Sequence, residues 1–245
     1  MAYYHCILFD VDGTLLDFEA SESKALVETL TRYNWPTDAE TQDTYRRINR
    51  DLWAALEQGK IKKDRLVIQR FEKFMQAIQV SGNAAEVNRF YLDRLGDHAD
   101  LMPGAAEVLR ELSEVATLAV VSNGVARVQY NRLEQSGLDK YMDGVFVSEK
   151  LGVEKPSRKF FETALRTLGV EQREKTLVVG DSLAADIQGG INAGLVTCWF
   201  NPAGQENPGS IRPTHTITTL EELYPLVMEE DELQNVGSRN RRHQI

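Results

Sequence analysis

The stretch that decides the fold is HCILFDVDGTLL at residues 5–16, where an apolar run ends in two acidic residues. Along a β-strand, residues two positions apart point to the same face. Asp10 and Asp12 therefore bring two carboxylates together where the strand stops. Two like charges in one place are unfavourable unless a cation, a hydrogen-bond donor or a reaction requires them. The pair predicts a functional site; the alternative is a solvated strand end with turn-forming residues.

Similar apolar runs recur along the chain, with segments of helical periodicity between them. Continuous runs of Val, Leu and Ile are typical of strands that are covered on both faces of a parallel sheet. The alternation of strands and helices predicts a doubly wound, Rossmann-like α/β fold. The expected strands are residues 4–11, 117–122, 144–148, 176–180 and 196–200, and the expected helices are residues 103–113, 125–136, 157–169 and 184–193.

Residues 17–98 interrupt this alternation, because they contain helical runs and no convincing strand. A segment of about 80 residues is long enough for a small helical domain of its own. We therefore assign residues 1–16 and 99–228 to an α/β core and residues 17–98 to an inserted helical cap. Residues 229–245 are polar and aperiodic, which predicts a disordered tail.

The composition is that of an ordinary globular protein with an acidic surface. The 245 residues carry a net charge of −9, which argues against nucleic acid as a partner. The two cysteines lie in apolar runs, as reduced and packed thiols do. No apolar run approaches the ~20 residues that a membrane span requires, and the N-terminal residues lack a signal-peptide pattern. We expect a cytoplasmic protein with no membrane association and no obligate protein partner.

Polar residues follow the first strand and three of the others. In an open α/β sheet, ligands bind at the carboxyl ends of the strands. Taken singly, these residues also fit a helix N-cap, a turn or a solvated lysine. Taken together, they predict a site at one edge of the sheet. Besides Asp10 and Asp12, the candidates are Ser122, Asn123 and Gly124 after the second strand, Lys155 after the third, and Asp181, Ser182 and Asp186 after the fourth.

This set of residues predicts phosphoryl transfer. A carboxylate such as Asp10 attacks phosphorus once its own charge and the phosphoryl charge are neutralised. Mg²⁺, with Mn²⁺ as a substitute, would neutralise them, held by the side chains of Asp10 and Asp181 and the backbone carbonyl of Asp12. Asp12 would also protonate the leaving oxygen and later deprotonate a water. The phosphoryl oxygens would be bound by Ser122, by backbone N–H groups of Asn123 and Gly124, and by Lys155.

The motifs DVDGT, SNG, the lysine of EKP and GDSLAAD resemble the four motifs of the haloacid dehalogenase-like hydrolase superfamily, in their expected order. The resemblance implies a phosphatase whose nucleophile is Asp10. It also implies that Asp186, with Ser182 beside it, orients the metal ligands from behind or binds the metal through a water. A C1-type helical cap would close over the site and select substrates. Members named for dehalogenation lack an acid at the position of Asp12, so its presence here favours phosphoryl transfer.

Three longer stretches, INRDLWAALEQGKI, SNGVARVQYNRLEQSGL and GGINAGLVTCWFNP, are similar to bacterial pyrimidine 5′-nucleotidases. This similarity implies hydrolysis of UMP, dUMP, dTMP and noncanonical analogues to nucleoside and phosphate, a house-cleaning role. In the cap, Asn49 is expected to pair with the base and Trp53 to contact the substrate, although cap aromatics also suit packing between helices. The alternatives are a sugar-phosphate or phosphoglycolate phosphatase, a phosphomutase, or a non-catalytic module that senses nucleotides.

Overall fold

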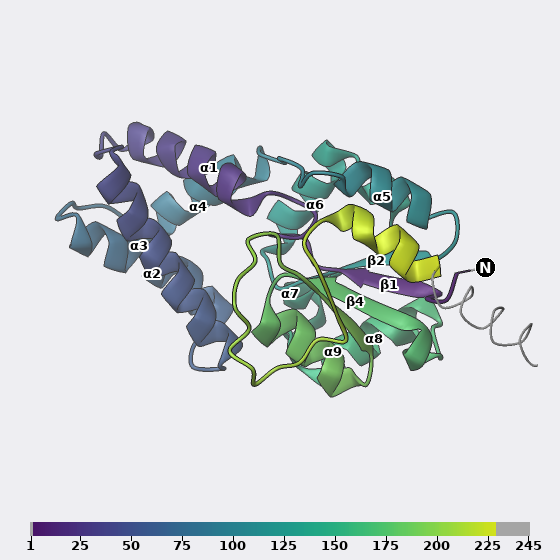
Figure 1. Cartoon of the computed structure of the whole chain (residues 1–245). Helices are drawn as coiled ribbons and strands as arrows, with labels where there is room; N and C mark the ends of the chain where they lie inside the picture. The colour runs from purple at the N-terminus through teal and green to yellow at the C-terminus, as the bar shows by residue number, and fades with distance from the viewer. Residues whose placement is uncertain (1, 229–245) are drawn as a thin grey trace, which may run out of the picture.

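A computed structural model describes residues 2–228 of the chain, so the predicted disordered tail lies outside the described residues (Figure 1). Its centre is a six-stranded sheet in the order β3-β2-β1-β4-β5-β6, in which every neighbouring pair is parallel. This topology confirms the predicted doubly wound fold. The strands are β1 (Cys6–Phe9), β2 (Thr117–Ser122), β3 (Gly144–Val147), β4 (Thr176–Gly180), β5 (Val196–Phe200) and β6 (His215–Ile217).

The central position of β1 sets where its acidic residues lie. Phe9 pairs with Val120 of β2 on one side and with Val179 of β4 on the other. The backbone N–H of Asp10 continues this pairing, because it donates to Val179 O at 2.9 Å. Asp10 therefore stands at the carboxyl edge of the sheet, at the point where the strand order reverses and ligands of such folds bind.

Helices cover both faces of the sheet, as the apolar character of its strands requires. Alternate residues of β1 enter two separate hydrophobic clusters, with Ile7 and Phe9 in one and Leu8 in the other. Cys6 and Cys198 are free, buried thiols, as expected. The first face packs against α5 (Ala105–Leu112) and α6 (Ala126–Ser136), and the second packs against α8 (Arg158–Leu168) and α9 (Gln188–Ala193).

Of the five helices between β1 and β2 in the sequence, the first four stand at one end of the molecule, beside the sheet (Figure 1). They share a hydrophobic cluster that includes the rings of Tyr45, Phe71 and Tyr91, whose centroids lie 5.4–5.6 Å apart. None of the helices among residues 2–228 combines the length and apolar character needed to cross a bilayer. The four helices are α1 (Phe18–Arg32), α2 (Ala39–Glu57), α3 (Lys63–Ala77) and α4 (Ala84–Gly96).

Two local features differ from the expected elements. Strand β6 was not expected, because three residues are too few to display a periodic pattern. The helix expected at 184–193 begins as a π-helical turn, η3 (Leu183–Ile187), before α9 continues it. Such turns often occur at functional positions. Here the turn carries Asp186.

Candidate active site

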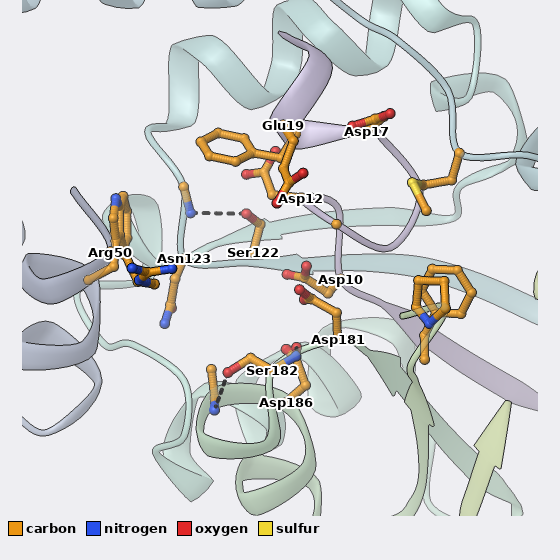
Figure 2. A pocket seen from close by; sticks show the side chains of 18 of the residues that line it. Asp10, Asp12, Asp17, Glu19, Arg50, Ser122, Asn123, Asp181, Ser182 and Asp186 are labelled. Atoms are coloured by element: carbon orange, nitrogen blue, oxygen red, sulfur yellow. Dashed lines mark hydrogen bonds between the residues drawn. The ribbon is translucent and has the colours of Figure 1, made fainter. Parts of the chain in front are cut away.

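A cavity of about 720 Å³ opens between the carboxyl edge of the sheet and helices α1 and α2. Every candidate site residue of the sequence analysis lines this cavity. Figure 2 shows the labelled carboxylates of Asp10, Asp181 and Asp186 gathered on one side. The sheet topology has therefore brought together residues from four separate strand ends. The candidates are Asp10, Asp12, Asn49, Trp53, Ser122, Asn123, Gly124, Lys155, Asp181, Ser182 and Asp186.

Lys155 lies at the floor of the cavity with all three ammonium hydrogens engaged. It donates to Oδ1 of Asp10 and Oδ1 of Asp186, both at 2.6 Å, and to the backbone oxygen of Val121 at 2.7 Å. Burial disfavours its positive charge, but the two carboxylates outweigh this and raise the pKa of Lys155 above its ordinary value. Lys155 is thus a fixed cation that orients the carboxyl group of Asp10.

Asp10, Asp181 and Asp186 offer carboxylate oxygens that all lie within 4.8 Å of one another. Burial raises the pKa of Asp10; Lys155 opposes this shift, and the neighbouring Asp186 and Asp181 add to it. Asp181 is exposed to the cavity, yet many protein atoms surround it. This desolvation, with repulsion from Asp186, raises its pKa to about 7. The raised pKa values indicate a site that lacks positive charge.

The charges of this cluster suit a divalent cation. Its carboxylates belong to Asp10, Asp12, Asp181 and Asp186, and the cations bonded to them belong to Lys155 and Arg132. When all of these groups are ionised, two negative charges remain unbalanced. Carboxylate and carbonyl oxygens are also the hard ligands that Mg²⁺ prefers. By charge and by donor type, the residues present fit the predicted metal.

Gly13 permits the close approach of the two loops that carry the acidic residues. A Cβ atom at this position would lie 2.6 Å from Oδ2 of Asp181, and its backbone φ of 81° is unfavourable for other residues. The backbone oxygen of Asp181 accepts a hydrogen bond of 2.8 Å from the indole N–H of Trp199 on β5. A tight glycine turn and an indole anchor therefore fix the distance between the ends of β1 and β4.

The side chain of Asp12 turns toward α6 rather than toward the acidic cluster. Arg132 donates through Nη1 to Oδ1 of Asp12, and Gln129 donates through Nε2 to Oδ2 at 2.5 Å. The Arg132 side chain is fully buried, whereas that of Asp12 is 29% exposed to the cavity. Two donors, one of them charged, thus fix the position of the Asp12 carboxyl group.

Neither Gln129 nor Arg132 was among the predicted site residues. A signal for both is present in the sequence, because they lie three residues apart on the helix face that also buries Ala126 and Leu133. Polar residues at positions where a helix faces the protein interior require partners there. Here the partner that they share is Asp12.

The loop after β2 contributes the hydroxyl of Ser122 and the side-chain amide of Asn123. Ser122 is buried, and its Oγ accepts hydrogen bonds from the backbone N–H of Gly124 at 3.0 Å and from Gln129 Nε2 at 2.9 Å. The amide of Asn123 forms two bonds of 2.9 Å with the backbone of Lys155, one as donor and one as acceptor. Asn123 therefore positions Lys155 through its side chain, a role that the sequence analysis did not assign to it.

Asp186 and Ser182 lie directly behind the acidic cluster. Besides Lys155, Asp186 binds the backbone N–H of Ser182 at 3.1 Å through its second oxygen. The Ser182 hydroxyl donates to Oε1 of Glu57, at the end of α2, at 3.0 Å. Burial raises the pKa of Glu57, and the Ser182 hydroxyl opposes the shift. This contact joins the helical region to the sheet beside the candidate site.

A second contact joins the same two regions on the other side of the cavity. Lys63, at the start of α3, donates through Nζ to Ser148 Oγ at 2.5 Å and to the backbone oxygen of Gly124 at 3.2 Å. Burial lowers the pKa of Lys63. The sequence offered no signal for this contact, because a lysine at a helix start ordinarily faces solvent.

One face of α2 forms the wall of the cavity opposite the sheet. Arg46, Asn49, Trp53 and Glu57 recur at the three- or four-residue spacing of a single helix face, and all four line the cavity. Trp53 is half-buried. Asn49 is buried, and both ends of its amide are already bonded: Nδ2 donates to Glu22 and Oδ1 accepts from Arg70. Asn49 thus belongs to a network within the helices as well as to the cavity wall.

The family model described as haloacid dehalogenase-like hydrolase matches residues 4–194. The chain is 38% identical to the HAD-hydrolase YfnB of Bacillus subtilis. A crystal structure of YfnB bound to magnesium superposes with a TM-score of 0.88, over 91% of this chain and 98% of that one. The chain is also similar to two pyrimidine 5′-nucleotidases, YjjG of Escherichia coli (35% identical, over 90% of this chain and 96% of that protein) and PynA of Streptococcus pneumoniae (37% identical, over 90% and 94%).

Proposed function

The chain belongs to the haloacid dehalogenase-like hydrolases, and we propose that it is a magnesium-dependent phosphatase that hydrolyses pyrimidine nucleoside 5′-monophosphates. The observation that carries this proposal is the cavity itself. One wall holds a carboxylate beside a fixed lysine and a cluster short of two positive charges, and the other wall belongs to helices that make no part of that cluster. The first wall suits phosphoryl transfer, and the second suits recognition of the leaving group.

In the first step, a carboxylate oxygen of Asp10 forms a bond to phosphorus while the bond from phosphorus to the nucleoside 5′ oxygen breaks. Lys155 holds Oδ1 of Asp10, so Oδ2, which accepts no hydrogen bond from the described residues, is free to attack. Asp12 gives a proton to the departing oxygen. In the second step, Asp12 takes a proton from water, whose oxygen bonds to phosphorus as the bond to Asp10 breaks. Hydrogen bonds from Arg132 and Gln129 hold the carboxyl group of Asp12 in place at the cavity through both steps.

The side chains of Asp10 and Asp181 and the backbone carbonyl of Asp12 would hold Mg²⁺, and Mn²⁺ would substitute. When bound, the ion offsets the charge of the acidic cluster and of the phosphoryl group. Asp186 remains behind these ligands, because Lys155 and the Ser182 N–H engage its two oxygens. The magnesium in the related YfnB structure supports this assignment.

The choice of pyrimidine nucleotides rests on the relatives and on the cavity wall. YjjG and PynA are named pyrimidine 5′-nucleotidases, and each is more than a third identical to this chain. The face of α2 that lines the cavity carries Trp53 for contact with an apolar ring surface and buried polar groups near Asn49 for its edge. Walls of this kind suit a planar, hydrogen-bonding leaving group better than a simple sugar.

A panel of phosphate monoesters tests the proposal. We expect UMP, dUMP and dTMP to give higher kcat/KM than AMP, GMP, phosphoglycolate or hexose phosphates, with one phosphate released for each nucleoside. Activity should disappear after exhaustive EDTA treatment and gel filtration and return with Mg²⁺. A preference for phosphoglycolate or a hexose phosphate would overturn the substrate assignment. Transfer of the phosphoryl group to a second sugar without free phosphate would indicate a mutase.

A further inference from the structure

Away from the sheet edge, the cavity wall contains a buried carboxyl group, that of Glu22. It is only 5% exposed, yet it lines the cavity from α1. Its Oε1 accepts a hydrogen bond of 2.8 Å from Nδ2 of Asn49. Its Oε2 accepts no hydrogen bond from any residue of the described chain. This oxygen keeps accessible surface on a residue that lines the cavity, so a donor on a bound ligand is the natural partner for it.

A network of neighbours fixes the direction of this carboxyl group. Arg70 donates to Oδ1 of Asn49 at 3.3 Å and to Oδ1 of Asn88 at 2.8 Å, and its guanidinium lies 4.6 Å from the ring centre of Tyr91. Since a guanidinium only donates, the Asn49 oxygen must face Arg70, and its NH₂ group must face Glu22. The acceptor is therefore held rigidly, and ligand binding does not have to order it.

The position of Glu22 along the cavity corresponds to the base of a nucleotide rather than to its sugar. Glu57 contacts Ser182 beside the acidic cluster, and Asn49 lies eight residues earlier on α2. At 1.5 Å per residue, the pair of Glu22 and Asn49 stands about 12 Å along the helix from that contact. In a 5′-nucleotide the ribose adjoins the phosphate and the base is the distant part. An acceptor displaced this far from the contact between Glu57 and Ser182 is placed to meet the base rather than the ribose.

We propose that Glu22 selects uracil and thymine by accepting a hydrogen bond from the N3–H of the base. The inference rests on the proposed nucleotidase function and assigns its base specificity to one residue. Uracil and thymine carry a hydrogen on N3, whereas cytosine presents an unprotonated N3 that would face the lone pairs of Glu22. A purine presents a different arrangement of hydrogen-bond donors and acceptors on its edge, and its two rings require a deeper cavity.

The charges around Glu22 are consistent with this role. Burial raises the pKa of Glu22 to about 7, against the opposing effects of Arg70, Arg46 and the Asn49 amide, and Glu19 adds slightly to the rise. The carboxyl group is therefore about half ionised near pH 7 and mostly ionised above it, and its ionised form gains from a further donor. The N3–H of a uracil ring supplies that donor without adding a charge to the cavity.

The test compares UMP with CMP on the parent protein and on Glu22→Gln. The parent should prefer UMP in kcat/KM by roughly tenfold to a hundredfold, the scale of one hydrogen bond to a buried charged group. In Glu22→Gln the amide can both accept from uracil N3–H and donate to cytosine N3, so the preference should fall to within about threefold. Glu40→Gln, an exposed residue of α2 with the same change in charge, should keep the parental ratio.

Two further measurements keep the inference falsifiable. If Glu22→Gln fails to fold, the parent should still discriminate against 3-methyl-UMP, which lacks the N3–H. Equal rates on UMP, CMP and 3-methyl-UMP, or an unchanged UMP to CMP ratio in folded Glu22→Gln, would overturn the inference. So would a change in the UMP to dUMP ratio, because this would place Glu22 on the ribose. Hydrolysis of p-nitrophenyl phosphate, which has neither base nor sugar, checks the proposed phosphatase function separately.

Discussion

The molecule buries charge in two regions and compensates it in two different ways. At the sheet edge, Lys155 is bonded directly to the carboxylates of Asp10 and Asp186, and negative charge remains in excess. In the helical region, the buried Arg70 is bonded to the neutral amide oxygens of Asn49 and Asn88. The first arrangement leaves a demand for a cation and an anionic substrate. The second leaves one oriented acceptor and no excess charge.

The two regions also differ in what positions their side chains. Backbone pairing of parallel strands sets the sheet edge, and a hydrogen bond from Asp10 N to Val179 O anchors the first acid there. In the helical region, packing of side chains from separate helices sets the network around Arg70 and Asn49. Changes in the helical region should therefore alter which substrate is hydrolysed, while changes at the sheet edge should alter whether any substrate is hydrolysed.

The sharpest test of this contrast removes the nucleophile. Asp10→Asn should lower kcat for every substrate by at least about 10⁴-fold, because a covalent nucleophile is lost with little change in shape. The measurement is phosphate release with Mg²⁺, accompanied by a thermal unfolding curve close to that of the parent. Turnover within tenfold of the parent, in a preparation free of other phosphatases, would contradict the covalent mechanism.

A second test concerns the donors that hold Asp12. Arg132→Met should lower kcat by about 10²-fold, since a displaced general acid–base group loses much of its contribution. It should also lower the free energy of unfolding by roughly 1–3 kcal/mol, because the Asp12 carboxylate loses its charged partner. Steady-state kinetics and urea unfolding measure the two effects. A variant of reduced stability but parental kcat would show that Arg132 serves the fold alone.

In the helical region, Asn49→Ala should separate the effect on stability from the effect on catalysis. The substitution leaves Glu22 Oε1 and one Arg70 donor without partners, which should cost roughly 2–4 kcal/mol in the free energy of unfolding. It should also reduce the preference for UMP more than the rate on p-nitrophenyl phosphate. Asn88→Ala is the matched control, because Asn88 bonds to Arg70 but does not line the cavity. Equal effects of both variants on selectivity would argue against a local role for Asn49.

The pH dependence of stability gives a further test, because the pKa shift of Glu22 determines whether stability rises or falls with pH. Its pKa rises from an ordinary 4.5 to about 7 on folding, so the folded state binds more protons than the unfolded state between these values. Stability should therefore fall as pH rises from 4.5 through 7, by up to on the order of 3 kcal/mol from this group. With Mg²⁺ present throughout, the fall between pH 5 and pH 8 should be smaller in Glu22→Gln than in the parent. Parallel curves would contradict the assignment.

The smallest effect is expected where the two regions touch. Lys63→Met removes the bond to Ser148, and Glu57→Gln weakens the bond from Ser182, each worth about 1 kcal/mol. We expect KM for UMP to rise by less than about tenfold in either variant, while kcat changes little. A large loss of kcat in Glu57→Gln would instead place Glu57 within the catalytic set.

The sequence carried enough information for the sheet edge because topology does most of the positioning there. Residues two apart in DVD, and polar residues at three further strand ends, must meet once parallel strands align. Family membership, hydrolase class and the doubly wound fold are confirmed. The assignment of residues 17–98 to a cap domain and the catalytic roles of single residues stay predictions.

The same reasoning could not predict the hydrogen bonds among the four helices or the partners of Asp12. Glu22, Asn49, Arg70 and Asn88 come from four helices, and their contacts depend on helix packing that no spacing rule specifies. Asn49 was selected for pairing with the base, but its amide is bonded within this network. A polar residue on a helix face gives no indication of whether it meets a ligand or another buried side chain.

The central place of β1 also has a consequence for how the protein is made. Cys6 pairs with Thr117 and Thr176, so both neighbours of the first strand leave the ribosome long after it. During synthesis the apolar strand β1 has no strand to pair with while the helical segment and then β2 leave the ribosome. The edge that carries Asp10 is complete only once Asp181 has followed β4. Nascent chains that stop before residue 176 therefore carry Asp10 but cannot assemble the acidic cluster around it, and their first strand lacks one of its two neighbours.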